Sequence, residues 1–384
     1  MHLIINTLSV AVDGGGIKTY LINIISALAN LKNPPEITLI CSHSSKPVFQ
    51  DLSEKENIRF ITIPVSSKLN LFRIILDQVV VPVVLLVRFR RSNKILITPS
   101  SVATIYSPLK QITIIQAPLV LKNIRGEVPA VFLNDLTSLR KIYYDLFLPK
   151  TVDKSQRLIT VSKYLKKKVE SLEPDAVNKT HVVYEGVDFD SFDLIDSEEK
   201  ESETEILFVS TLYSYKNADK VIKAFGRAIE LKQISEDTIL RVIGNDPSGG
   251  ERMEKLQILA RECNIGSRII FSGYIAHREI GKYYKKASVF VFPSSVETFG
   301  LPPLEAMACG VPVIASNRMS VPEIVGDAGL VVDPNDIDSI ADSFENILKD
   351  HQLRRELIRK GYKRAREFNW KIAGKRIIEI AESL

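Results

Sequence analysis

Two glutamates, Glu297 and Glu305, stand eight positions apart in the stretch 288–316, SVFVFPSSVETFGLPPLEAMACGVPVIAS. An ionised carboxylate can accept hydrogen bonds from a vicinal diol through both of its oxygens. Between the glutamates, Gly300 permits a ligand to approach the backbone closely. The helix expected next offers free N–H donors and the positive end of a dipole, a favourable place for a phosphate. The pair therefore fits a ligand with a diphosphate between two polyols, as in a nucleotide sugar.

A strand, a loop and a short helix are expected to position the two glutamates. The apolar run Val289–Phe292 predicts a buried strand. A helix is expected to begin near Pro302, because a proline at the first helical position has no N–H group to leave unsatisfied, and Gly310 suits the left-handed residue just past its end. Pro312–Ala315 then predicts a second strand. Glu305 would lie in the first helical turn, where a carboxylate either binds a ligand or caps its own helix.

The wording of this stretch resembles the glutamate-x7-glutamate signature of retaining family 4 glycosyltransferases, which have the GT-B fold. The matching residues are Pro293, Ser294, Glu297, Thr298, Phe299, Gly300, Leu301, Pro302, Leu304, Glu305, Ala306, Met307, Ala308, Gly310, Pro312 and Val313. The resemblance implies that Glu297 orients the transferred sugar and offsets its positive charge, while Glu305 holds the ribose diol of the donor. Phe299, Gly300 and Leu301 are implied donor contacts in the loop.

Lys216 is the candidate cation for the donor diphosphate. It follows a strand predicted over residues 206–210 and precedes a predicted helix, whose positive dipole end disfavours a lysine. This stretch resembles the family pattern Gly-x-Leu…Lys-Asn, and the resemblance implies that Lys216 neutralises the diphosphate. Thr211 stands where many family members have arginine, and Tyr274 and Ile275 match positions that hold the nucleotide base.

The first half of the chain offers a glycine loop and a glutamine. Residues 11–20, AVDGGGIKTY, stand between a predicted strand and a helical pattern, which cradles a phosphate or merely makes a tight turn. The loop lacks the G-x-G-x-x-G and GK[ST] patterns. By resemblance, Gly15 and Gly16 face the donor diphosphate, and Gln116 stands where the family usually has a histidine near the donor sugar. Gln116 can hydrogen-bond a sugar hydroxyl but cannot act as an acid or base, and Ser210 likewise replaces a usual glycine.

The chain is long enough for two hydrophobic cores. It has 384 residues, of which 45% are hydrophobic and 25% charged, as in ordinary globular proteins. Both halves alternate predicted strands and helices, which favours parallel sheets with a ligand crevice at the carboxyl ends of the strands. We therefore predict an α/β protein with two doubly wound Rossmann-like domains and an interdomain cleft, and the resemblance implies that this is the GT-B fold. By the same resemblance, the expected parts are an acceptor-side domain over 1–189, a linker over 190–204, a nucleotide-sugar-binding domain over 205–367, and a helix over 368–384 that returns to the first domain.

Charge is spread unevenly along the chain. The first 190 residues hold 24 Lys and Arg against 16 Asp and Glu, and the remainder holds 27 against 30. A basic half indicates either an anionic ligand or surface, or only solvated faces. Within it, the apolar stretch Leu69–Arg91 predicts a buried helix kinked at Pro82, or an apolar element that contacts an anionic membrane with the help of Arg88, Arg90 and Arg91.

No metal or other cofactor is expected. Cys41, Cys263 and Cys309 are scattered without metal-ligand spacing, which favours a reducing compartment. Asp188 and Asp190 could be taken for a metal-binding pair, but by resemblance this stretch opens the connection between the domains. The start MHLIINTL is expected to be a first strand and not a signal peptide. A cytoplasmic enzyme is therefore expected, with the inner face of the cell membrane as an optional place of contact.

Together these features predict a retaining glycosyltransferase with Glu297, Lys216 and Gln116 as candidate catalytic residues. It would move mannose or another hexose from a nucleoside diphosphate sugar to a hydroxyl of a glycan or lipid-linked acceptor. The expected setting is bacterial surface polysaccharide synthesis: lipopolysaccharide, capsule or exopolysaccharide. The family implies front-face attack by the acceptor, without an enzyme nucleophile. A GT-B sugar-nucleotide epimerase and a catalytically silent nucleotide-sugar binder stay open as alternatives, and nucleic acid is not an expected partner.

Overall fold

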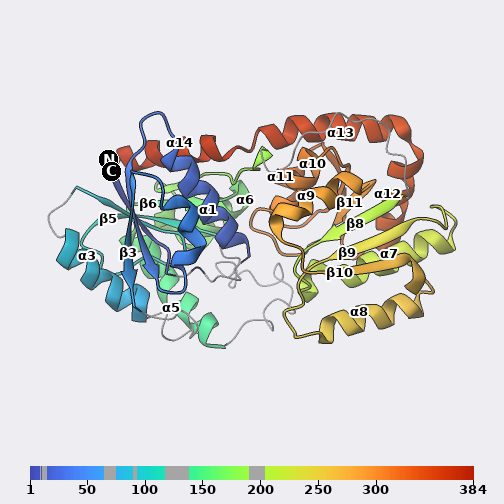
Figure 1. Cartoon of the computed structure of the whole chain (residues 1–384), viewed down its shortest axis with the longest axis horizontal. Coiled ribbons are helices and arrows are strands. Elements are labelled where there is room, and N and C mark those ends of the chain that lie inside the picture. Colours follow the sequence, from blue (N-terminus) through green and yellow to red (C-terminus); the bar gives the residue numbers. More distant parts are fainter. Residues whose placement is uncertain (9, 11–14, 65–74, 90–92, 117–137, 190–203) are drawn as a thin grey trace. The chain divides into compact units, whose positions relative to one another are not determined.

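A computed structural model describes most of the chain (Figure 1). The described residues are 1–8, 10, 15–64, 75–89, 93–116, 138–189 and 204–384, with only the backbone described for 138–145. They form two compact units: the first holds the described parts of residues 1–186 together with Trp370–Leu384, and the second holds those of Val187–Asn369. The linker expected over 190–204 lies outside the described residues except for its last position.

The first unit is built on a parallel sheet of seven strands. They are β1 (His2–Asn6), β2 (Glu36–Ser42), β3 (Ile58–Ile63), β4 (Ile95–Thr98), β5 (Lys110–Ile115), β6 (Arg157–Thr160) and β7 (Thr180–Val182), in the order β3-β2-β1-β4-β5-β6-β7. The central strands are aliphatic runs, as expected of strands with both faces covered. The chain adds strands on one side of β1 and then on the other, so the carboxyl ends of β1 and β4 form a topological switch point.

Helices connect these strands (Figure 1). They are α1 (Gly16–Ala29), η1 (Lys46–Leu52), η2 (Leu76–Val80), α3 (Val81–Phe89), α5 (Ser138–Lys154), α6 (Lys163–Leu172), η4 (Pro174–Ala176) and α14 (Trp370–Glu382). Ser162 caps α6, because its Oγ accepts a hydrogen bond from the Leu165 N–H at 3.2 Å. The terminal helix α14 lies against α1, with the rings of Tyr20 and Trp370 edge to face at 5.6 Å.

The apolar stretch Leu69–Arg91 forms one continuous helix in its described part, from Ile75 to Phe89. The interruption expected at Pro82 appears one turn earlier, as the π-helical turn η2, in which the Val81 N–H reaches back to the carbonyl of Leu76. The helix is buried on one face only. Among the described residues, none of the helices is both long enough and apolar enough to span a bilayer.

The second unit is built on a parallel sheet of six strands. They are β8 (Glu205–Val209), β9 (Ile239–Ile243), β10 (Ile269–Gly273), β11 (Val289–Phe292), β12 (Val313–Ser316) and β13 (Gly329–Val332), in the order β10-β9-β8-β11-β12-β13. Its switch point lies between β8 and β11. A Cβ at Gly244, just after β9, would stand 1.8 Å from the carbonyl oxygen of Ser210, so only glycine permits this close approach of two backbones.

The connections of the second unit are helical as well. They are η6 (Ser214–Lys216), α7 (Ala218–Glu230), α8 (Glu251–Glu262), η7 (Gly266–Arg268), α9 (His277–Lys286), α10 (Leu301–Ala308), α11 (Val321–Val325), α12 (Ile337–Lys349) and α13 (His351–Arg366). Phe208, Phe225 and Phe344 pack into one buried core with the aliphatic strands. The predicted α/β class with two doubly wound parallel sheets is therefore confirmed.

Candidate active site

The loops after β8 and β11 meet at the switch point of the second sheet, because these neighbouring parallel strands end at the same edge. The Ser295 N–H donates to the Tyr215 carbonyl at 2.8 Å. The Asn217 amide donates to the Pro293 carbonyl and to Ser295 Oγ, both at 2.7 Å. Asn217 adopts a left-handed conformation, with φ of 60°. The two loops are thus joined into one surface.

Lys216 and Glu297 form an ion pair across these loops. The Lys216 ammonium donates to Oε1 of Glu297, and both side chains are largely buried. The Lys216 Nζ also lies 5.5 Å from the centre of the Phe292 ring. A buried ion pair costs desolvation of both charges, so its presence is weak evidence for a purely stabilising role. The sequence analysis expected Lys216 to contact the diphosphate and Glu297 to contact the sugar of the donor, whereas in the structure the two side chains contact each other.

The turn into α10 depends on Gly300. This residue is the N-cap of α10 with φ of 109°, in the left-handed region that favours glycine. The helix therefore starts at Leu301, and Glu305 is its fifth residue. The prediction that Glu305 lies in the first turn was wrong, because the left-handed Gly300 starts the helix one residue before Pro302. Gly310 has the predicted left-handed conformation after the helix, with φ of 70°.

A serine fixes the loop that carries Glu297. Ser320 Oγ donates to the carbonyl oxygens of Glu297 at 2.8 Å and of Phe299 at 3.0 Å. The Phe299 ring is buried edge to face against Phe368, with centroids 5.7 Å apart. Phe299 can therefore offer a ligand its backbone but not its ring. The sequence reasoning missed Ser320, which stands beyond the signature stretch.

Two residues of α9 hold the buried carboxylate of Glu305. The Tyr284 hydroxyl donates to Oε2 at 3.0 Å, and Nε2 of His277 lies 2.9 Å from Oε1. The hydrogen bond to Glu305 raises the pKa of His277 above its usual value, and burial raises the pKa of Tyr284. These contacts exclude the reading of Glu305 as a cap of its own helix. Sequence reasoning missed both partners, although their spacing of seven residues places them on one helix face.

The remaining donor candidates of the second unit lie along the same sheet edge. Tyr274 and Ile275 follow β10, and the Tyr274 side chain is exposed and free to stack on a base. Thr211 follows β8, and its carbonyl accepts the Tyr213 N–H at 2.8 Å. Lys216, Glu297 and the start of α10 complete this edge. The site residues predicted in the second unit thus all follow strands of one parallel sheet, at the edge where those strands end.

The candidates of the first unit lie at the carboxyl ends of β1 and β5. Gly15 is the N-cap of α1 and Gly16 its first residue. Among the described residues, a Cβ at either position would meet nothing within 4 Å apart from its own chain neighbours and helix backbone. This open helix start agrees with a phosphate contact. Gln116 follows β5, its N–H donates to Ser101 Oγ at 2.9 Å, and its buried amide lies near the buried hydroxyl of Tyr20.

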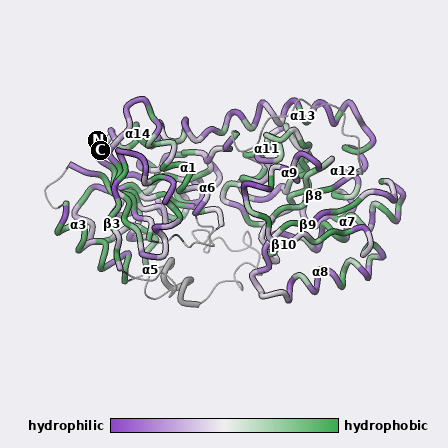
Figure 2. Tube along the Cα trace, viewed as in Figure 1, coloured by the Kyte–Doolittle hydropathy of each residue, from purple (hydrophilic) through white to green (hydrophobic). Residues whose placement is uncertain are grey.

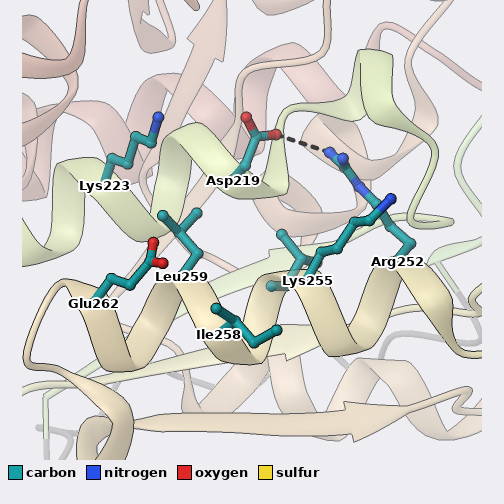
Figure 3. Close-up of a pocket in the computed structure, with 8 residues that line it drawn as sticks. Asp219, Lys223, Arg252, Lys255, Ile258, Leu259 and Glu262 are labelled. Atoms are coloured by element: carbon teal, nitrogen blue, oxygen red, sulfur yellow. Dashed lines mark hydrogen bonds and ion pairs between the residues drawn. The ribbon is translucent and has the colours of Figure 1, made fainter.

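Other features of the second unit do not resemble a donor site. In the described ranges, no three His, Cys, Asp or Glu side chains gather as metal ligands would. Of the acidic pair considered above, Asp188 lies near His277, and Asp190 falls outside the described residues. A groove of about 300 Å³ lies between α7 and α8, and Arg252 pairs there with Asp219 at 2.9 Å. Figure 3 shows the side chains that line it. That groove contains none of the predicted site residues.

Known proteins share both the sequence pattern and the fold. The O-antigen chain mannosyltransferase B of Escherichia coli is 47% identical over 102 residues, 27% of each chain. An uncharacterized glycosyltransferase of Methanocaldococcus jannaschii is 30% identical over 240 residues, 59% of this chain and 60% of that protein. The chain thus spans between about a quarter and three fifths of these two relatives.

Solved structures agree with the two-sheet architecture. The crystal structure of Anabaena HepE in complex with UDP and glucose superposes with a TM-score of 0.75 at 15% identity, over 100% of both chains. At this identity the likeness establishes the fold alone, which is the GT-B fold that the resemblance implied. The family model described as glycosyl transferases group 1 matches residues 191–364, which contain the whole Lys216–Glu297–Glu305 edge. Over these residues, a little under half of the chain, the protein is similar to the glycosyl transferases group 1 family.

Proposed function

We propose that the protein is a retaining glycosyltransferase of the family 4 type that moves a hexose, with mannose as the first candidate, from a nucleoside diphosphate sugar to an acceptor hydroxyl. The observation that carries the proposal is the switch-point edge: a lysine paired with Glu297, a glycine-capped helix start, and a buried Glu305 held from α9. The relative with O-antigen mannosyltransferase activity supports mannose and a surface polysaccharide acceptor. The HepE complex supports a nucleotide donor.

Charge on the leaving diphosphate is met by protein groups in this proposal. Lys216 changes partner from Glu297 to the diphosphate when the donor binds, and the free N–H groups at the start of α10 add donors. Glu297, released from its lysine, then orients the sugar and offsets the positive charge that develops on it. The acceptor hydroxyl forms a bond to the anomeric carbon on the face from which the diphosphate departs, the bond between that carbon and the diphosphate oxygen breaks, and the hydroxyl proton goes to the departing diphosphate. By resemblance, Gly15, Gly16 and Gln116 remain candidate contacts from the first unit.

Glu305 has the hydrogen-bonding capacity that a ribose diol needs. A carboxylate offers about four acceptor positions. Tyr284 and His277 occupy one on each oxygen. As far as the described residues go, one position per oxygen is then left for the two hydroxyls of a vicinal diol. We therefore assign Glu305 to nucleotide affinity.

The proposed chemistry needs no divalent metal, because Lys216 and backbone N–H groups can neutralise the diphosphate. Activity in EDTA should equal activity with added magnesium or manganese. Complete loss of turnover in EDTA that manganese restores would contradict this assignment.

The experiment that tests the function starts with a thermal-shift screen of uridine, guanosine and adenosine diphosphates and their hexose derivatives, since binding to the folded state raises its melting temperature. The best donor is then incubated with and without a glycan acceptor. A transferase releases the diphosphate in the presence of acceptor and gives a product with the anomeric configuration of the donor. Interconversion of sugar nucleotides without acceptor would favour an epimerase, and binding without any turnover would favour a silent binder.

A further inference from the structure

The helix formed by η2 and α3 exposes apolar side chains along one face. Ile75, Val79, Val83, Leu86 and Val87, here called the aliphatic stripe, are each between 45% and 77% exposed. Their spacing of four, four, three and one places them on one side of a helix. Figure 2 shows the hydrophobic run along α3. Single exposed apolar residues are ordinary, whereas five on one face mark an interaction surface.

The opposite face of the same helix buries polar groups. Asp77 is buried and accepts a hydrogen bond from the Asn6 amide at 2.9 Å. Gln78 is buried too: its amide nitrogen donates to the Ala103 carbonyl at 2.9 Å, and its oxygen accepts the Ile105 N–H at 3.0 Å. Rotating the helix to hide the aliphatic stripe would leave these groups unpaired. The fold therefore holds the stripe outward.

The buried face also carries apolar anchors. Leu76, Val81, Leu85 and Phe89 belong to a core cluster of the first unit. The exposed valines thus contribute little to that core, and the helix stays in place without them. An apolar face that the core does not use is available for a partner.

The composition of the stripe favours a lipid partner over a protein partner. Protein interfaces concentrate their binding energy in Trp, Tyr and Arg, with Leu and Val under-represented. The stripe contains only Val, Ile and Leu. Arg88 is exposed beside Val87, and the Lys94 ammonium lies 4.5 Å from the centre of the Phe89 ring at the same end of the helix. In a bilayer, an aliphatic face can insert among the acyl chains while neighbouring cations bind the anionic headgroups.

We propose that η2 and α3 form a membrane-docking surface, in which the aliphatic stripe enters the headgroup and acyl boundary of an anionic bilayer and Arg88 contacts lipid phosphates. The helix would lie along the interface and not cross it. Membrane binding by this helix does not depend on sugar transfer, so either proposal can be wrong while the other holds. If both hold, the first unit would meet lipid-linked acceptors at the bilayer surface.

Vesicle flotation of the full-length protein tests the proposal. The vesicles are pure phosphatidylcholine, or phosphatidylcholine with a quarter of phosphatidylglycerol. The test variant carries Val79→Ser, Val83→Ser and Val87→Ser. The matched control carries Val177→Ser, Leu231→Ser and Ile258→Ser, which are scattered positions between 41% and 51% exposed.

The wild type and the control should float with the anionic vesicles, and the test variant should bind at least about tenfold more weakly, because binding strength scales with the apolar area buried. Arg88→Gln should give a smaller loss, visible at low salt and absent at high salt. Val87→Ser alone, at the most exposed position, gives a second measurement if the triple variant melts early.

Three results would overturn the proposal. The test variant could float as well as the wild type, or the wild type could bind neutral and anionic vesicles equally. Sedimentation without vesicles could instead show that the wild type self-associates and that the test variant does not, which would assign the stripe to a contact between two copies of the chain. Donor-induced thermal shifts, measured in parallel, report on the proposed function separately.

Discussion

Glu297 and Glu305 belong to one short stretch, yet the protein holds them in different ways. Glu297 sits on a loop, and its carboxylate pairs with the flexible ammonium of Lys216. Glu305 sits inside a helix, and its carboxylate is buried between the Tyr284 hydroxyl and the His277 ring. One has a cationic partner from another loop, and the other has two partners from a neighbouring helix.

This difference indicates that Glu297 acts in the transfer reaction and that Glu305 acts in binding the nucleotide. A lysine on a long side chain can exchange one anion for another, so Glu297 can gain an unpaired charge when a diphosphate binds. A carboxylate held by a buried tyrosine keeps one orientation, which suits a constant hydrogen-bond acceptor for the nucleotide. The following predictions test this division, from the largest expected effect to the smallest.

Glu297→Gln should lower turnover by on the order of a hundredfold or more, because it removes charge that acts mainly in the transition state. Affinity for the nucleoside diphosphate should stay nearly unchanged, since Lys216 remains and Glu297 is assigned to the sugar and not to the nucleotide. Initial rates and calorimetric titration measure the two quantities. Loss of diphosphate affinity in this variant would contradict the division.

Lys216→Gln should weaken binding of the nucleoside diphosphate by about ten- to a hundredfold, because a hydrogen bond to a charged group contributes about 1.5–3 kcal/mol. Binding of the nucleoside without phosphates should not change, which makes it the internal control. In the double variant with Glu297→Gln, the effects on turnover should be less than additive, because the residues act through one contact. Strict additivity would argue that they work independently.

Glu305→Gln should weaken nucleotide binding by about ten- to a hundredfold on the same energetic basis. The loss should be much smaller for a 2′-deoxynucleoside diphosphate, which offers one hydroxyl fewer. Turnover at saturating donor should fall less than in Glu297→Gln. Equal losses for the ribose and deoxyribose ligands would mean that Glu305 does not contact the diol.

His277→Gln should have the smallest effect of the four substitutions, and the effect should be a change in how the melting temperature depends on pH. The pKa of His277 is raised in the folded protein by Glu305, so the protonated pair stabilises the fold fully below the usual histidine value of 6.5. That stabilisation is lost as the pH rises through the raised pKa. The melting temperature of the wild type should therefore exceed that of His277→Gln most at acidic pH, and the two should converge as the pH rises. A difference independent of pH would indicate simple packing.

The local sequence pattern was sufficient to predict much of the secondary structure that carries the candidate site. The apolar run before Pro293 and the spacing of Gly300 and Gly310 predicted strand, loop and helix, because these depend on neighbours in the chain. The same reasoning placed Glu305 too close to the helix start. The helix begins one residue earlier than expected, because Gly300, with φ of 109°, is its N-cap. Boundaries of this kind depend on how the loop is held, here by Ser320.

The amino-acid sequence by itself determined the alternation of strands and helices, the two glutamates and the lysine, because periodicity and residue type are local properties. Tertiary structure decided the partners. Lys216 and Glu297 are 81 positions apart, and His277 and Glu305 are 28 apart, so only the order of strands in the sheet brings each pair together. It also decided which face of α3 is outward, because Asp77 and Gln78 find their hydrogen-bond partners on other segments of the first unit.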